Sequence, residues 1–451
     1  MSKLALFGGS KAVTKSLIGE NGIASFVPKI NDKARATILD LLDKGEISES
    51  PVVTDFEARF KDYIGTRFAL CQCSGSMSIF AALFGLGIGR GDEVIVPSFT
   101  FPTSATTILP LGAVPVFADV DPDSHCIDAA DIEKRITPKT KAIVVVHVWG
   151  NPCDMDAIMA VAKKHNLKVL EDCSHAHGAT YKGKKVGSIG DVGCFSLQGS
   201  KLMYGGEAGI LTTNDEEVFF RAASLGSYER LYGYGFYADL ESTKLESPYK
   251  IYKGTALGMK LRVHPLAIAI ADSELDHLDE RNVIRNRNAN HLNELLSDIS
   301  CINNVKVYDG AERVFGYHYM RYDHELNGGV LRETILKALV AEGVTVGACG
   351  YGHLHEDPTF TQVNDNWPKC YPYGEKHDAV YLPITSYLHD TVFMAAPRFE
   401  DADGFEAVEQ YAEAYHKVIA ATDELLRYEK DHADELVAMR PRSGRSINIV
   451  K

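Results

Sequence analysis

The chain has 451 residues and a net charge of −14, which suits one large and one smaller domain with a buried core. The acidic balance argues against a nucleic-acid or anionic membrane surface, since either needs a basic footprint, and no apolar stretch approaches the length of a membrane span. Nine cysteines at irregular spacing, without a secretory signal, indicate a reducing compartment. We therefore expect a soluble cytoplasmic protein.

Apolar strand-like runs alternate with amphipathic helices from about residue 60 to residue 215. The expected helices cover 76–86 and 155–165, and the expected strands cover 93–96, 114–118, 142–148 and 168–170. Near-continuous Val and Ile runs joined by helices indicate a mostly parallel sheet that is buried on both faces. Ligands of such sheets bind at the carboxyl ends of the strands.

The second half of the chain begins with a change of pattern. Five tyrosines fall between Tyr228 and Tyr249 among glycines and charges, which predicts a long loop over 226–256. The elements expected after it are helices at 266–297, 331–342 and 404–428, strands at 305–308 and 317–322, and a loosely held basic tail at 440–451. We predict an N-terminal segment and large domain over 1–275, and a small α+β domain over 276–451.

Two residues carry the clearest chemical signal. Asp172 ends the short apolar run 168–172 (KVLED), and Lys201 closes the run 194–201 (CFSLQGSK). Pyridoxal 5′-phosphate (PLP) needs such a pair, because an amine forms an imine with its aldehyde and a carboxylate keeps its ring nitrogen protonated. Most lysines are solvated surface charges, so the pair alone leaves that interpretation open.

Further motifs follow one another in a consistent order. They are 4–9 (LALFGG), 45–48 (GEIS), 74–76 (SGS), 91–98 (GDEVIVPS), 171–178 (EDCSHAHG), and 194–201 with 204–207 (YGGE). Over nearly the whole chain this set resembles the DegT/DnrJ/EryC1/StrS family of PLP-dependent sugar aminotransferases. The resemblance implies the α/β fold-type I architecture, with Lys201 and Asp172 as the catalytic residues.

The resemblance also implies a phosphate site. Ser74, Gly75 and Ser76 match the family's Ser-Gly-Thr turn, with Ser76 in place of Thr, and Ser196 matches a phosphate-binding serine. Because the turn leads directly into a helix, its backbone N–H groups and the helix dipole can hold a phosphate. The alternative is an ordinary serine N-cap with a tight turn.

Three more residues match family positions, two of them around the ring. Phe101, after Thr100, matches the aromatic residue that lies against the pyridine face, and the alternative for it is core packing. His175 matches a Gln or His that faces the phenolic oxygen, although a histidine in such a loop is often structural. Glu207 matches the acid of the family's Gly-Glu-Gly-Gly run.

Lys260 marks a departure from the family. Family members usually have Asn there, and that Asn reaches the phosphate of the partner subunit's cofactor. A lysine could make the same contact as a point charge, or it could be a surface lysine near the dimer interface. The resemblance thus implies a homodimer with shared active sites.

We expect no metal site. Cys71 and Cys73 lack a second cysteine pair at zinc-ribbon spacing and fit a buried strand. His353 and His355 lie in a stretch that resembles the family's substrate-side loop, where contact with the substrate by His355 is open. No role is assigned to His177.

These observations predict a PLP-dependent aminotransferase that moves an amino group from glutamate or glutamine to a ketone of a sugar, cyclitol or related small molecule. One alternative is a PLP-dependent dehydratase, although family dehydratases replace the lysine by histidine. Another is a non-catalytic protein that binds PLP or a sugar. An NAD enzyme is disfavoured, because no Gly-x-Gly-x-x-Gly follows an early strand.

Overall fold

A computed structural model describes residues 3–14, 30–231, 244–252, 257, 259–361, 380–400 and 404–432. The large domain holds a seven-stranded sheet in the order β1-β9-β8-β5-β4-β2-β3. The strands are β1 (Phe68–Gln72), β2 (Glu93–Pro97), β3 (Val114–Ala118), β4 (Thr140–Val146), β5 (Lys168–Asp172), β8 (Val192–Ser196) and β9 (Gly209–Thr213). β3, β2, β4, β5 and β8 run parallel, whereas β9 is antiparallel to β8 and β1. The predicted mostly parallel α/β sheet is confirmed.

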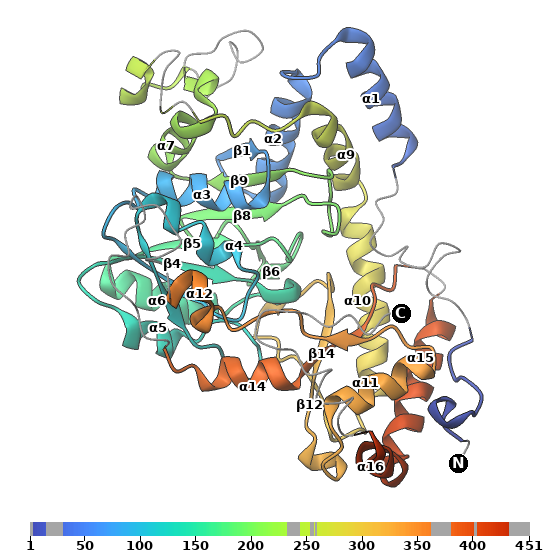
Figure 1. Cartoon of the computed structure of the whole chain (residues 1–451). Coiled ribbons are helices and arrows are strands. Elements are labelled where there is room, and N and C mark those ends of the chain that lie inside the picture. The colour runs from blue at the N-terminus through green and yellow to red at the C-terminus, as the bar shows by residue number, and fades with distance from the viewer. Residues whose placement is uncertain are drawn as a thin grey trace.

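Helices cover both faces of this sheet (Figure 1). They are α1 (Asp32–Lys44), α2 (Pro51–Ile64), α3 (Gly75–Gly85), α4 (Thr103–Thr106), α5 (Ala129–Arg135), α6 (Met155–His165), α7 (Glu216–Gly226) and α9 (Pro265–Leu275). Successive side chains of β1 point to opposite faces. Leu70 therefore packs in the core of α3 and α7, while Cys71 packs with Phe56 and Phe60 of α2.

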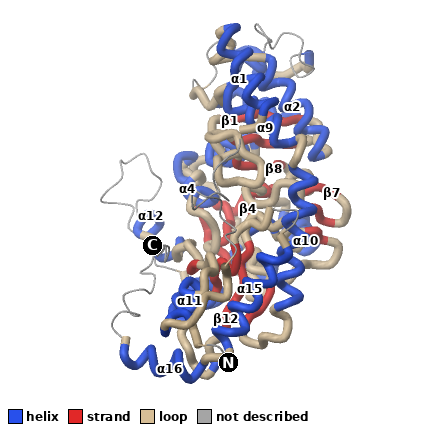
Figure 2. Tube along the Cα trace, turned by 90° about the vertical axis from the view of Figure 1, so that its right-hand side faces the viewer, coloured by secondary structure: helices blue, strands red, loops and turns tan. Residues whose placement is uncertain are grey.

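The small domain is an α+β layer. Its antiparallel sheet has the order β10-β12-β14-β13, and the long helix α10 leads into it from the large domain (Figures 1 and 2). Its elements are α10 (Leu278–Leu295), β10 (Ile302–Asn304), β12 (His318–Tyr322), α11 (Arg332–Ala341), β13 (Gly347–Ala348), β14 (Val392–Ala396), α15 (Phe405–Ile419) and α16 (Thr422–Asp431). A smaller ribbon joins β6 (Thr180–Tyr181), β7 (Lys184–Lys185) and β11 (Ala311–Glu312).

The predicted domain boundary at 275/276 falls between α9 and α10. Segments on each side of this boundary pack against the other domain. Leu4 and Val13 pack in the core of the small domain. Conversely, α12 (Pro358–Thr361) and α14 (Pro383–Thr391) pack on the large domain. The Asp119 carboxylate at the end of the β3 segment accepts hydrogen bonds from Ile384 N and Thr385 N, and so caps α14.

One predicted strand is wrong. The strand expected at 305–308 lies instead at 302–304, as β10. The backbone of Lys306 does not pair with another strand. Its N–H donates to Asp123 O, and its carbonyl accepts from Asn151 Nδ2. These contacts to the large domain replace a strand partner. The strand expected to reach 148 ends at Val146, and a 3₁₀ turn follows it at Val148–Gly150, where Trp149 has a left-handed φ of 51°.

Two predicted helices are each interrupted. The helix expected at 266–297 is divided between α9 and α10 at Asp276, whose carboxylate pairs with Lys33 and Arg59. The helix expected at 404–428 is divided between α15 and α16, where Thr422 Oγ1 donates to Asn327 Oδ1 over 2.7 Å. The tail at 440–451 and much of 226–256 lie outside the described residues. Among the helices that are described, none is long and apolar enough to cross a membrane.

Candidate active site

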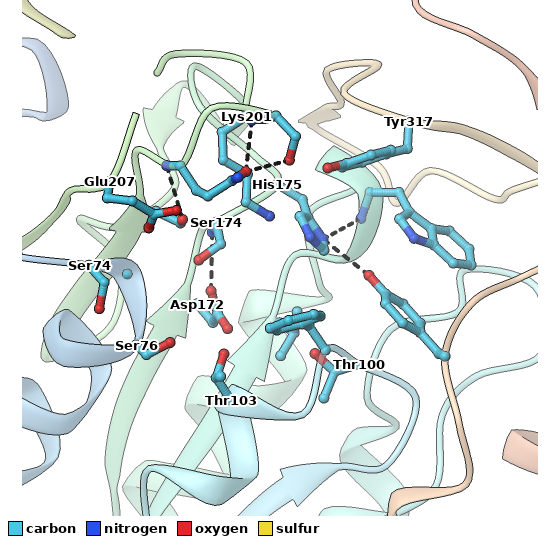
Figure 3. Close-up of a pocket in the computed structure, with 18 of the residues that line it drawn as sticks. Ser74, Ser76, Thr100, Thr103, Asp172, Ser174, His175, Lys201, Glu207 and Tyr317 are labelled. Atoms are coloured by element: carbon cyan, nitrogen blue, oxygen red, sulfur yellow. Dashed lines mark hydrogen bonds between the residues drawn. The ribbon is translucent and has the colours of Figure 1, made fainter. Parts of the chain in front are cut away.

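A cavity of about 520 Å³ opens at the carboxyl ends of β4, β5 and β8 (Figure 3). It receives residues from both domains. The lining residues are Ser74, Gly75, Ser76, Thr100, Phe101, Thr103, Val146, Trp149, Asp172, Ser174, His175, Ser196, Gln198, Ser200, Lys201, Glu207, Tyr317, Tyr319 and Tyr351. All predicted cofactor-binding residues except Lys260 therefore lie in one cavity.

One end of the cavity is built from the start of α3. Ser74 Oγ accepts from Met77 N over 3.2 Å, so Ser74 is also the ordinary N-cap of this helix. The first N–H groups of a helix have no intrahelical carbonyl and can bind an anion. A Cβ on Gly75 would lie 2.5 Å from Ser196 Cβ, so only glycine lets α3 approach the end of β8 this closely. This end fits a phosphate.

Asp172 lies at the end of β5 and is buried. Its Oδ2 accepts from Ser104 Oγ over 2.8 Å, and its Oδ1 accepts from Ser174 N over 3.1 Å. Ser104 Oγ in turn lies 3.1 Å from Thr100 Oγ1. These contacts fix the carboxylate at the cavity wall, where it fits a protonated ring nitrogen.

Lys201 lies in the turn after β8, across the cavity from Asp172 (Figure 3). Its N–H donates to Gln198 O over 2.9 Å, and Gln198 Oε1 accepts from Ser200 N over 2.7 Å. The turn therefore has its own hydrogen bonds, and an aldehyde between Lys201 and Asp172 would meet the amine. Glu207 lines the cavity near this turn.

His175 is buried beside Lys201. Its Nδ1 lies 3.4 Å from Trp149 N and 3.5 Å from Tyr351 Oη (Figure 3). Because Nδ1 accepts from a backbone N–H, the proton of the neutral ring is on Nε2. Burial, then the nearby charge of Lys201, lowers the pKa of His175 well below its usual range. His175 is thus a neutral hydrogen-bonding group.

Aromatic rings from three distant segments form another wall. The Trp149 ring stacks on Tyr319, with centroids 4.0 Å apart, and on Tyr351, at 5.6 Å. Phe101 also lines the cavity and is 56% exposed in the single chain. Burial raises the pKa of the Tyr317 phenol, but Lys201 and Arg398 outweigh it, so that the pKa is lowered.

Three residues singled out in the sequence do not line the cavity. Lys260 is exposed on the surface of the single chain. His355 is buried, and its Nδ1 lies 2.7 Å from Ser98 Oγ, so its contacts here are structural. His177 is buried against Phe195, and burial lowers its pKa to about 3.

Sequence reasoning missed several cavity residues. Trp149, Tyr317, Tyr319 and Tyr351 were not considered, nor was Ser104, which holds Asp172. Tyr317 and Tyr319 are two residues apart in the expected strand at 317–322, which was a signal that both side chains lie on one face. Nothing in the sequence indicated that Trp149 would stack on them.

A buried polar group lies next to Asp172. Ligand atoms of His147, Glu171 and Cys173 lie within 4.8 Å of one another. Both oxygens of Glu171 accept hydrogen bonds, from His147 Nε2 over 3.0 Å and from the backbone N–H groups at 187, 189 and 190. Burial raises the pKa of Glu171, but these hydrogen bonds outweigh it and lower the pKa. We assign the group a structural role beside the cavity.

A mostly parallel sheet, with a cavity at its carboxyl edge that holds Lys201, Asp172 and the start of a helix, fits a PLP-dependent transferase of fold type I. The model of the DegT/DnrJ/EryC1/StrS aminotransferase family matches residues 28–392. The chain belongs to this family. Its cofactor is PLP, and the aminotransferase prediction is confirmed over the dehydratase and the non-catalytic alternatives.

Individual relatives agree with the family. The chain is 32% identical over 425 residues to an L-glutamine:scyllo-inosose aminotransferase of Streptomyces griseus, covering 89% of this chain and 95% of the relative. It is 36% identical over 324 residues to a GDP-perosamine synthase of Caulobacter vibrioides, covering 71% and 82%. The X-ray structure of an aminotransferase from Psychrobacter cryohalolentis has a TM-score of 0.76 at 27% identity, covering 88% and 99%.

Proposed function

We propose that the protein transfers the amino group of glutamine to the ketone of a cyclitol. The observation that carries this proposal is a single cavity that holds Lys201, Asp172 and a helix N-terminus, walled by aromatic rings. The inosose aminotransferase named above matches over nearly its full length. When bound, PLP supplies an aldehyde that receives the amino group and a ring that takes up electrons.

We assign the following roles to this chain's residues. The amine of Lys201 would hold the aldehyde of PLP and, when free, would move a proton at the reacting carbon of the substrate. Asp172 keeps the ring nitrogen protonated. The phosphate would be held by Ser74, Gly75, Ser76 and Ser196. Two residues would orient the ring: Phe101 by stacking and His175 by a hydrogen bond.

The aromatic wall supports a cyclitol as the acceptor. Trp149, Tyr319 and Tyr351 stack together and give the cavity an apolar wall, while Thr100 and Thr103 add hydroxyl groups to its lining. A polyhydroxylated ring has both C–H faces and hydroxyl groups to match these surfaces. A nucleotide-linked keto sugar is the second candidate, because the GDP-perosamine synthase is 36% identical.

A shared site in a homodimer is part of the proposal. The loop of Lys260 runs beside the phosphate turn, since Cys73 N donates to Leu261 O over 2.7 Å, yet the Lys260 side chain is exposed. Apolar side chains near the loop are also exposed, among them Leu257 at 57% and Met259 at 42%. A second subunit would cover these side chains. Lys260 would then reach the phosphate of the cofactor that the second subunit holds.

We also propose a cytoplasmic location. The eight cysteines within the described residues are all free thiols, at positions 71, 73, 126, 153, 173, 194, 301 and 349. Such thiols persist where glutathione and thioredoxin keep cysteines reduced.

The amino donor alone provides the test. Glutamine added to the PLP-loaded protein should bleach the absorbance of the lysine-bound cofactor and release one keto acid per site without an acceptor. An inosose should then restore the absorbance and appear as the amine, whereas a nucleotide-linked keto sugar should not. Lys201→Ala should bind glutamine and stall. An unchanged spectrum with glutamine and glutamate would refute the proposal.

Mixed dimers test the shared site. A Lys201→Ala subunit lacks the amine, and a Lys260→Ala subunit lacks the contact for its partner. In the mixed dimer one site keeps both groups and should regain activity. Fully active monomers on dilution would contradict the shared arrangement.

A further inference from the structure

Arg398 joins the small domain to the turn that carries Lys201. It follows β14, and its guanidinium reaches back across the domains. Nε donates to Gly316 O over 2.7 Å, Nη1 donates to Lys201 O over 3.3 Å, and Nη2 donates to Ser200 O. Its Cζ also lies 5.2 Å from the centroid of the Tyr317 ring. One planar group thus binds three carbonyls and one ring.

The carbonyls of Ser200 and Lys201 belong to consecutive peptide groups, so binding both fixes the backbone orientation of Lys201. Within the large domain this turn is held by backbone hydrogen bonds, as in Gly199 N to Gly206 O at 2.8 Å. Arg398 therefore supplies a contact from the opposite domain. A lysine could not replace it, because an ammonium lacks the rigid planar fork that reaches several acceptors.

Arg398 does not line the cavity and is not placed to touch the substrate, although Tyr317, over which it lies, does line it. We propose that Arg398 is a positioning residue that holds Lys201 in the orientation needed to bond the cofactor's aldehyde. The proposal rests on the proposed role of Lys201. The placement of the small domain then controls how readily the lysine reacts.

The test compares two cofactor forms on the apoprotein. PLP reports both the phosphate site and Lys201, whereas pyridoxamine phosphate cannot bond the lysine and reports the phosphate site alone. In Arg398→Lys, the rate of covalent bonding to PLP, followed by absorbance, should fall by about tenfold or more, because charged hydrogen bonds are lost. Binding of pyridoxamine phosphate, followed by tryptophan fluorescence, should change by less than about threefold.

Arg332 offers a matched control. It is a buried arginine of the small domain whose Nη1 donates to two carbonyls, His389 O over 2.7 Å and Val392 O over 3.0 Å, and it does not line the cavity. Arg332→Lys should lower the melting temperature and leave both cofactor measurements unchanged. A merely structural Arg398 would behave in the same way.

The outcomes separate this proposal from the proposed function. If reduction with borohydride fails to label Lys201 in the wild-type protein, the proposed function fails. If Lys201 is labelled but Arg398→Lys bonds PLP at the wild-type rate, or loses both cofactor forms equally, the positioning role is refuted. Should Arg398→Lys and Arg398→Gln both fail to fold while Arg332→Lys folds, Arg398 is a fold residue and the proposal is overturned.

Discussion

Replacing Gly75 by alanine tests whether the start of α3 holds the cofactor phosphate. The new Cβ would lie 2.5 Å from Ser196 Cβ and 2.8 Å from Ser196 Cα, so the helix start and the end of β8 must separate by about 1 Å to reach ordinary van der Waals contact. Overpacking of this kind costs about 1–3 kcal/mol of unfolding free energy. Because both segments line the proposed phosphate site, the same shift should break a phosphate contact.

The effect on PLP follows from that contact. A hydrogen bond to a charged group contributes about 1.5–3 kcal/mol, so losing one should weaken PLP affinity by about tenfold to a hundredfold. The assay is titration of the apoprotein with PLP, with urea unfolding measured in parallel. Gly75→Ala should lose both affinity and stability.

Gly85→Ala is the control at the other end of the same helix. Its Cβ would lie 2.7 Å from Val218 O, far from the cavity lining, so it should lose stability and keep its PLP affinity. Equal PLP affinities in the two variants would refute the placement of the phosphate at this helix start.

Three further predictions concern the site and its surroundings. Asp172→Asn should keep PLP but lose several kcal/mol of transition-state stabilisation in kcat, about tenfold for each 1.4 kcal/mol, and a rate within threefold of wild type would exclude Asp172 as the partner of the ring nitrogen. Ser104→Ala, which leaves the Asp172 carboxylate without its 2.8 Å donor, should lower the free energy of unfolding in urea by about 1.5–3 kcal/mol, and no change would mean that this contact is not formed. Burial is the main cause that lowers the pKa of His125 and of His318 to about 3. Below the unfolded pKa of about 6.5, the unfolded chain therefore binds more protons than the folded chain, and the free energy of unfolding decreases as the pH decreases. Well below about pH 6.5 the expected decrease is about 1.4 kcal/mol per histidine for each pH unit. Urea unfolding at about pH 7.5 and pH 5.5 checks this sign, and a more stable protein at the lower pH would contradict it.

The mostly parallel α/β class of the large sheet could be predicted because it depends on local patterns. Runs such as 142–146 are apolar throughout and alternate with amphipathic helices over much of the large domain, so the sequence pattern indicated the α/β class. The elements of the small domain were harder to predict. Its strand β10 is three residues long, and the interruption of the helix at Asp276 has neither glycine nor proline to mark it.

The residues of the site also divide into those that local sequence could predict and those that it could not. Asp172, Lys201 and Ser76 follow strands or open a helix, so local sequence and family motifs located them. Trp149 and Tyr351 are more than two hundred residues apart in sequence, and they meet only through packing between segments. Ser104 contacts Asp172 for the same reason, from a short helix without its own motif.

The cap that Asp119 gives to α14 bears on how this protein can be divided experimentally. Cutting the chain at 275/276 would separate the carboxylate from Ile384 N and Thr385 N, and would expose Leu382 and Leu388, which are fully buried in the intact molecule. A fragment of 276–451 would therefore carry an uncapped helix with an unprotected apolar face. Expressed alone, such a fragment should aggregate, and soluble recovery should require co-expression with the part of the chain that contains Asp119.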